Sequence, residues 1–339
     1  MDKEFLNDTL LDDELLSDDL MPAAVARIRA KENTLLSDKD LEDLMACETY
    51  DECIQLLLEK GWGPTDNNTP EELLTLERER MWELMNSLCS AREAQTFDIF
   101  RYSTDFHNLK VAIKESYVQK ETPNVYMDGG TIPIAQLKKC AADADFGSLP
   151  LIMMRAADEA REVLFRAGDS QMCDVIIDKA CLDSISECAG KSDNALLKDY
   201  AEFKCAAANI NIAIRACKTG KDSEFLSRAL ADCKSVSPIQ IMAAARNGLN
   251  AVYEYLEQTI YKDAADAIRE GSAAFDRWCD NRLIKLIKPQ KYNAFTISPL
   301  AAYVLAKECE IKSVRLILSG KLNDLLDGMI RERLRESYV

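Results

Sequence analysis

Two pairs of adjacent aspartates near the N-terminus are the residues whose spacing most resembles a catalytic motif. Asp12 with Asp13 and Asp18 with Asp19 form carboxylate pairs of the kind that can hold magnesium against a diphosphate. Such a site also needs a second acidic cluster and basic residues that bind the phosphates, and the sequence supplies neither beside these pairs. We therefore interpret the pairs as part of a solvated acidic segment.

A glycine–lysine sequence at residues 219–223 has some features of a phosphate-binding loop. These residues read Thr-Gly-Lys-Asp-Ser, without the upstream glycine of such a loop and without a hydroxyl group directly after the lysine. They also follow a helical pattern rather than a strand. We interpret Gly220 as the end of a helix.

Histidine and cysteine chemistry is limited by number and by spacing. His107 is the only histidine, and one histidine cannot supply a two-histidine metal site. The 12 cysteines contain no C-x-x-C pair, so we expect reduced, buried thiols and an intracellular protein. His107 lies beside Asn108, where a hydrogen-bonded packing role is the simpler interpretation. The sequence therefore predicts no catalytic residue, no metal site and no cofactor.

The segment that contains His107 belongs to a pattern that occurs three times. Three segments share one arrangement of aliphatic residues: residues 105–114, 206–215 and 310–319. In each segment a polar residue stands directly before the first shared aliphatic position: Asn108 in the first, Asn209 in the second and Ser313 in the third. A second pattern, lying between these segments or before them, also occurs three times: residues 41–56, 137–152 and 241–256. Two patterns that recur about every hundred residues predict one helical unit copied three times, and three copies can surround an axis.

Two interpretations of the repeated polar positions stay open. Asparagine within an aliphatic helix lowers helix propensity and needs hydrogen-bond partners when it is buried. Asn108 and Asn209 could form interhelical hydrogen bonds that fix the packing. They could also line a central cavity together with Ser313, since a repeat places equivalent residues in equivalent environments.

Arginines and aromatic residues supply the remaining candidates for partner contacts. Arginines on helices are solvated by default, but some of them could contact an acidic partner surface: Arg27, Arg29, Arg315, Arg331, Arg333 and Arg335. We expect four aromatic residues to pack in the core or at hinges rather than to form a ligand cage: Trp62, Trp82, Trp278 and Tyr292.

The composition predicts an all-α protein. Glycine (12 of 339 residues) and proline (9) are scarce, and leucine, alanine, glutamate and lysine are abundant. No apolar run approaches the roughly 20 residues of a membrane span. The formal net charge of −16 argues against a nucleic-acid partner.

Breaks in the helical pattern divide the chain into an acidic arm and three units. The arm, residues 1–21, holds eight acidic residues and one lysine. We predict helical units at residues 22–118, 119–221 and 222–339. Helices are expected to start after Ser37, at Thr69-Pro70 and at Ser237-Pro238. One long helical stretch is expected from Glu71 to about Val118, and a last helix around residues 329–338.

With these motifs in place, the sequence resembles the C subunit family of V-type (V/A-type) ATPases, whose eukaryotic member is the d subunit. The resemblance covers residues from about Pro22 to Val339 and rests on residues 26–29, 105–110, 298–300, 307–312, 318–322 and 330–335. Two features depart from the family pattern. The acidic arm before Pro22 is unlike the usual short start, and Ser313 stands where the family commonly has asparagine.

The resemblance implies a funnel of three similar helical domains around a pseudo-threefold axis. It implies a non-catalytic subunit of the central rotor, peripheral to the membrane on its cytoplasmic side, in a complex that couples ATP hydrolysis or synthesis to ion transport. One face would receive the central shaft subunits, and the other would sit on the proteolipid ring. Without the resemblance, the alternative is a helical-repeat scaffold that binds a partner helix or peptide in a concave groove.

Overall fold

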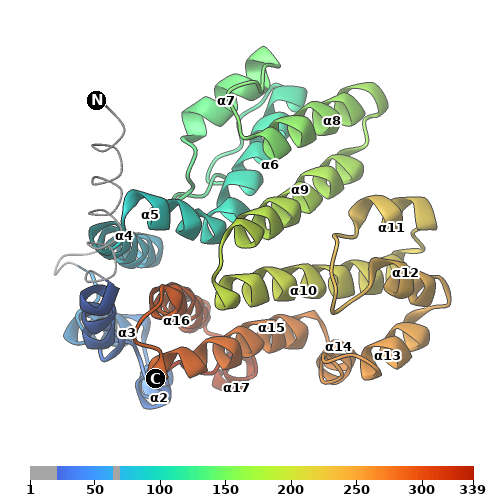
Figure 1. Ribbon diagram of the computed structural model, residues 1–339. Coiled ribbons are helices and arrows are strands. Elements are labelled where there is room, and N and C mark those ends of the chain that lie inside the picture. The colour runs from blue at the N-terminus through green and yellow to red at the C-terminus, as the bar shows by residue number, and fades with distance from the viewer. Residues whose placement is uncertain (1–20, 64–68) are drawn as a thin grey trace, which may run out of the picture. The chain divides into compact units, whose positions relative to one another are not determined.

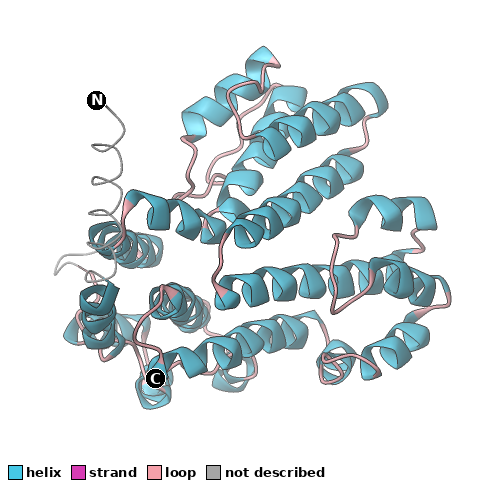
Figure 2. Cartoon of the chain, viewed as in Figure 1, coloured by secondary structure: helices cyan, strands magenta, loops and turns pink. Residues whose placement is uncertain are grey.

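The computed structural model describes residues 21–63 and 69–339, and all regular secondary structure in this part of the chain is helical (Figure 2). The predicted all-α class is confirmed. Of the predicted acidic arm, only Met21 is described, and it lies in a helix whose described residues are 21–32. The aspartate pairs at positions 12–13 and 18–19 lie outside the described residues.

The chain forms two compact units, which we describe separately. The central unit, Gln95–Arg269, is one continuous stretch of chain, drawn from cyan to orange in Figure 1. The terminal unit joins the described residues up to Ala94 to Glu270–Val339, so that segments from both ends of the sequence share one core. The sequence predicts three units, and that division stays a prediction.

The central unit begins within α5 and ends within α14. Its elements are α5 (Ala91–Phe97), η1 (Asp98–Phe100), α6 (Tyr102–Val118), α7 (Ile134–Asp143), α8 (Leu151–Ala167), α9 (Ser170–Lys191), α10 (Ala195–Thr219), α11 (Ser223–Ala229), α12 (Pro238–Arg246), α13 (Leu249–Glu257) and α14 (Ala264–Glu270). Helix α9 packs against α6, α8, α10 and α11. Its buried side is lined by small and aliphatic residues that allow close helix packing, including Ala180, Ile177 and Ile185.

The terminal unit combines N-terminal and C-terminal helices. After the helix at residues 21–32 come α2 (Asp38–Ala46), α3 (Tyr50–Glu59), α4 (Pro70–Leu88), and then α15 (Ser272–Ile287), η2 (Lys288–Tyr292), α16 (Ser298–Leu322) and α17 (Asp327–Arg331). Helix α16 packs against α2, α3, α4, α15 and α17. Its N-terminal part, residues 298–307, is buried on every side, which explains why residues 300–306 are apolar on every face of the helix.

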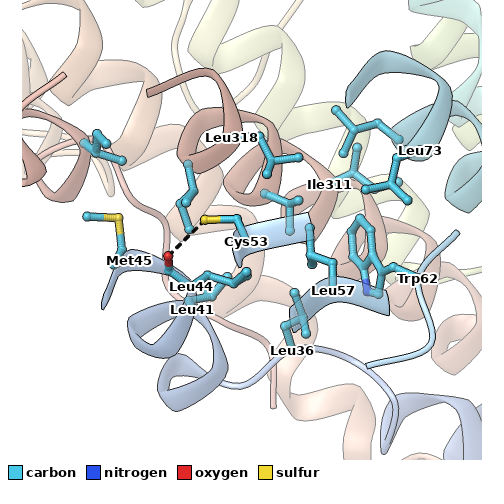
Figure 3. Close-up of a cluster of buried hydrophobic side chains, with 14 residues drawn as sticks. Leu36, Leu41, Leu44, Met45, Cys53, Leu57, Trp62, Leu73, Ile311 and Leu318 are labelled. Atoms are coloured by element: carbon cyan, nitrogen blue, oxygen red, sulfur yellow. Dashed lines mark hydrogen bonds between the residues drawn. The ribbon is translucent and has the colours of Figure 1, made fainter. Parts of the chain in front are cut away.

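One hydrophobic cluster joins the two ends of the sequence (Figure 3). Leu41, Leu44 and Leu57 from α2 and α3 meet Ile311 and Leu318 from α16, and all of these side chains are at most 3% exposed. Trp62 lies at one side of the cluster in Figure 3 and is 2% exposed. The prediction that Trp62 packs in the core is therefore confirmed.

Several helix boundaries follow the capping chemistry in the sequence. Ser37 and Asp40 bond reciprocally across the first turn of α2, and Thr69 does the same with Glu72 at the start of α4. Gly220 ends α10 in the left-handed conformation with φ of 67°, so residues 219–223 are a helix end, as predicted.

The helical stretch predicted from Glu71 to about Val118 is helical but is divided into separate elements. Helix α4 ends at Leu88, and α5, η1 and α6 follow it as separate elements. The reason is a second capping signal: the backbone N–H of Ser90 donates to the Glu93 carboxylate at 2.7 Å, and this bond starts a new helix. The last helix also differs from the prediction, because α17 ends at Arg331. The chain beyond it is bonded to other elements, with Ser337 N–H donating to Asp38 at 3.0 Å.

The sequence repeats correspond to one recurring packing arrangement. Each long helix that carries the first pattern packs against a pair of helices that carries the second: α6 against α7 and α8, α10 against α12 and α13, and α16 against α2 and α3. In the central unit the long helix precedes its pair, whereas in the terminal unit the pair comes from the N-terminal side of the sequence. The arrangement of three copies around an axis stays a prediction.

Candidate functional site

The described residues offer little for catalysis. Within residues 21–63 and 69–339, no group of three or more histidine, cysteine or acidic residues is placed to hold a metal ion. The cysteines are free thiols. Burial raises the pKa of Cys53 and of Cys309 to about 12 in each case, so both stay protonated at neutral pH and are poor nucleophiles.

A compact set of charges is buried in the terminal unit. The Lys307 ammonium group on α16 lies 2.6 Å from Glu310 and 2.9 Å from Glu77 of α4, and these side chains are between 5% and 8% exposed. The ammonium also lies 4.2 Å from the centre of the Trp62 ring. Glu310 accepts a further hydrogen bond from the backbone N–H of Leu36. This buried charge cluster therefore joins α16 to α4 and to the segment before α2.

The two carboxylates of the cluster are compensated unequally. Glu77 has a second cation, Arg80, at 2.8 Å, whereas Lys307 is the one cation that pairs with Glu310 in the described part of the chain. Burial alone would lower the pKa of Lys307, but Glu310 and Glu77 outweigh it and raise that pKa. Burial raises the pKa of the Glu310 carboxyl group, although Lys307 opposes this shift. Glu310 is thus the weakly compensated member of the cluster.

A second set of ion pairs holds the end of the chain. The Asp280 carboxylate on α15 lies 2.7 Å from Lys312 of α16 and 2.9 Å from Arg335. Burial would raise the pKa of Asp280, but Lys312 and Arg335 outweigh it and lower that pKa. Residues 307–312, which carry much of the family resemblance, therefore act in packing and ion pairing inside the terminal unit.

The two repeated asparagines make the same pair of hydrogen bonds. Both side chains are fully buried. The Asn108 amide donates to the carbonyl of Met127 and accepts from its N–H, both at 2.8 Å. Asn209 makes the corresponding bonds with Ala231 at 2.8 and 2.9 Å. Each asparagine thus satisfies the backbone of a non-helical segment that follows its own helix, and neither makes the bond to another helix that the packing interpretation predicted. Asn108 also lines a hollow of about 230 Å³ at residues 127–134.

The other candidates lie in different environments. His107 Nε2 is 2.9 Å from the Val125 carbonyl, and Ser313 is 2% exposed on α16. Arg27 is exposed. Arg29 pairs with Glu32 at 2.7 Å and donates to two backbone carbonyls near η2, and Arg315 pairs with Glu71 at 2.9 Å. Their proposed role in partner contacts stays a prediction.

Two exposed apolar surfaces of the terminal unit were not predicted from the sequence. Tyr292 and Phe295, between α15 and α16, are 92% and 80% exposed, so the prediction that Tyr292 packs in the core or at a hinge is wrong. Leu322, the last residue of α16, and Leu326, directly before α17, are 59% and 74% exposed. Patterning could not identify these residues, because both surfaces lie beside helix ends where apolar periodicity stops.

Comparison with known proteins places this arrangement in a family. The profile of the ATP synthase (C/AC39) subunit family matches residues 24–333. The chain belongs to this family. The match runs through both compact units and includes the buried charge cluster and both repeated asparagines. The resemblance based on residues 26–29, 105–110 and the C-terminal motifs is confirmed.

Two relatives of the C/AC39 family align over nearly the whole chain. The C subunit of the V-type sodium ATPase of Enterococcus hirae is 24% identical over 322 residues, which cover 92% of this chain and 97% of that protein. The C subunit of the A-type ATP synthase of Methanocaldococcus jannaschii is 23% identical over 352 aligned positions, which cover 93% of this chain and 87% of that protein. Both belong to rotary ATPases. In the part of the chain that the structure describes, no helix is long and apolar enough to cross a membrane.

Proposed function

We propose that this chain is a non-catalytic central-stalk subunit of a V/A-type ATPase, which couples the rotating shaft to the proteolipid ring during ATP-driven ion transport or ATP synthesis. The observation that carries the proposal is the match to the family over residues 24–333. The protein would act at the cytoplasmic side of the membrane as a peripheral part of the complex. One surface would bind the shaft subunits, and another would bind the ring.

The packing of the terminal unit supports a mechanical role. A subunit that transmits torque must resist deformation between its two interfaces, and close-packed helices have low compressibility. Here the two ends of the sequence are joined by one hydrophobic cluster and by the buried pairs of Lys307 and Asp280. A load applied to either end is therefore shared by α4, α15 and α16.

The exposed apolar surfaces suit a subunit with more than one partner. Leu322 and Leu326 lie on a segment that is held firmly: Lys321 donates to the Met45 carbonyl at 2.8 Å and pairs with Asp327 at 2.9 Å. An apolar surface on a fixed segment needs little ordering when it binds, which favours affinity. We propose this surface as a contact for a protein partner of the rotor.

Co-purification tests the proposal. Tagged shaft subunits are mixed with the detergent-solubilised proteolipid ring, with or without this chain. We expect the ring to be retained with the shaft only when the chain is present. A variant with Leu322→Ser and Leu326→Ser should weaken retention on one side, and the matched control Ile239→Ser, at an exposed apolar position of the central unit, should not. Equal retention of the ring without the chain would contradict the proposed role.

The alternative of a helical-repeat scaffold predicts a different result in the same assay. A scaffold would bind a single helix or peptide and would join neither the shaft nor the ring. The magnesium-diphosphate alternative predicts heat in a calorimetric titration with both ligands. An absence of heat would remove that alternative.

A further inference from the structure

The segment between α15 and α16 presents two aromatic rings on a backbone that is held in place. We define the aromatic segment as residues 288–297. Tyr292 and Phe295 are the most exposed of the large hydrophobic residues within the described part of the chain, at 92% and 80%. Aromatic rings at such exposure lose nothing in packing when they are replaced, so the fold does not explain them.

The backbone of the aromatic segment is held by hydrogen bonds from Arg29 and by a hydrogen bond within the segment. The Arg29 guanidinium group, held by Glu32 at 2.7 Å, donates to the carbonyls of Gln290 and Asn293. The Asn293 amide donates to Thr296 Oγ1 at 2.8 Å. The rings are thus presented by a preorganised turn, which reduces the entropy that binding would cost.

A row of basic residues leads into the aromatic segment. We define the basic row as Arg282, Lys285, Lys288 and Lys291, which recur every third residue along α15 and η2. No aspartate or glutamate occurs between positions 281 and 306, although the whole chain has a net charge of −16. Lys285 is 3.5 Å from Glu336, and Lys291 lies 4.8 Å from the centre of the Tyr338 ring. This stretch of an acidic chain therefore carries only positive formal charge.

Exposed aromatic rings beside lysines match the chemistry of a membrane–water interface. Tyrosine side chains are favoured at the headgroup level of a bilayer, and lysines near the surface are attracted to anionic lipids. The two rings are 92% and 80% exposed, whereas sites for small ligands are concave and bury most of the ligand. A flat or soft anionic surface therefore fits this segment better than a small charged ligand does.

We infer that the aromatic segment and the basic row form a contact site for anionic phospholipid headgroups. The contact would be peripheral, with the rings of Tyr292 and Phe295 in the headgroup layer and Lys288 beside lipid phosphates. The inference goes beyond the proposed function and does not depend on it. A chain that failed to join shaft and ring could still bind anionic vesicles, so the two tests fail separately.

Vesicle flotation with the full chain tests the inference. The probes are vesicles of phosphatidylcholine alone and vesicles of equal parts phosphatidylcholine and phosphatidylglycerol, at about 100 mM salt, where the screening length is about 10 Å. We expect binding to the anionic vesicles only, and we expect the bound fraction to fall as salt rises. The Tyr292→Ala, Phe295→Ala double variant should lose at least about tenfold in partitioning, because both rings leave the interface.

Charge substitutions give a second measurement. Lys288→Gln should lower partitioning to anionic vesicles about fivefold, the factor that corresponds to about 1 kcal/mol for one basic residue near such a surface. The matched controls Lys218→Gln and Ile260→Ala change an exposed lysine and an exposed aliphatic residue of the central unit and should leave partitioning unchanged. All these positions have limited packing, and equal thermal melting curves would show that the variants stay folded.

Four results would overturn the inference. The unmodified chain could bind neutral and anionic vesicles equally, or it could bind neither. The double aromatic variant could bind as well as the unmodified chain, or binding could appear only after residues 1–20 are removed. The last result would assign the segment to the acidic arm of the same chain. Conservative Tyr292→Trp should retain binding, and its failure to do so would also count against an interfacial aromatic contact.

Discussion

Replacing Lys307 by methionine tests the energetics of the buried charge cluster. The substitution keeps most of the side-chain volume and removes the cation that pairs with Glu310, which is 2.6 Å away and nearly buried. Removing one partner of a buried ion pair costs about 3–5 kcal/mol, because the other charge stays desolvated. For a unit of this size, 1 kcal/mol shifts the melting temperature by about 2–4 °C, so we expect the terminal unit to melt roughly 6–20 °C lower.

The pH dependence of this loss has a definite sign. The pKa of Glu310 is already raised by burial, and removing Lys307 raises it further. A carboxyl group whose pKa is higher in the folded protein stabilises the fold below its unfolded pKa, and this contribution is lost as the pH rises through the folded pKa. The deficit of Lys307→Met should therefore be smaller at pH 5 than at pH 8, because Glu310 can take up a proton.

Thermal melting followed by circular dichroism at both pH values provides the assay. Adding Glu310→Gln to Lys307→Met should recover much of the loss, since the amide oxygen can still accept from Leu36 N–H and no charge is stranded. Lys60→Met, which removes an exposed partner of Asp40, is the control and should leave the melting temperature nearly unchanged. A deficit below about 1 kcal/mol, or one that is equal at the two pH values, would refute the reasoning.

Three further predictions concern other parts of the chain. Asn209→Ala should cost about 2 kcal/mol in urea unfolding, because it leaves the buried backbone N–H and carbonyl of Ala231 without partners, whereas Asn108→Ala should cost less, because Met127 is 45% exposed and water can replace the lost bonds; a larger cost for Asn108→Ala would contradict this. Asp280→Asn should destabilise the chain at pH 7 but much less below pH 4, because the lowered pKa of Asp280 stabilises the fold above the unfolded value and this is lost on acidification; a pH-independent loss would count against it. Gly320→Ala should cost about 1–3 kcal/mol, because its Cβ would lie 2.4 Å from Ile330 Cδ1, whereas Gly190→Ala, with open space around it, should be neutral or stabilising; equal melting temperatures would contradict this.

Much of the fold could be predicted from local chemistry. The caps at Ser37 and Thr69 and the left-handed end at Gly220 were predictable because each uses side chains within a few residues of the boundary. The break at Cys89 was not predicted, since the apolar pattern continues across it and only the Ser90–Glu93 bond marks a new start. Periodicity alone therefore predicts one helix at a point where the chain ends one and begins another.

Longer-range features of the site were harder to predict. The charges of Lys307 and Glu310 lie three residues apart and look like an ordinary exposed helix pair in sequence. Their burial depends on Glu77 and on Leu36, which come from the other end of the chain. For Tyr292 the sequence predicts burial, but the side chain is exposed. An aromatic residue is usually buried, and only the turn held by Arg29 exposes this one.

The central claim, that the chain is a mechanical coupling without chemistry of its own, is tested most directly in a reconstituted complex. ATP hydrolysis and ion movement are measured together in proteoliposomes that contain the whole V/A-type ATPase, prepared with and without this chain. We expect hydrolysis to continue without the chain while ion movement stops, and we expect both to be coupled again when the chain is added back. ATP-driven ion movement at the full ratio in its absence would contradict the account.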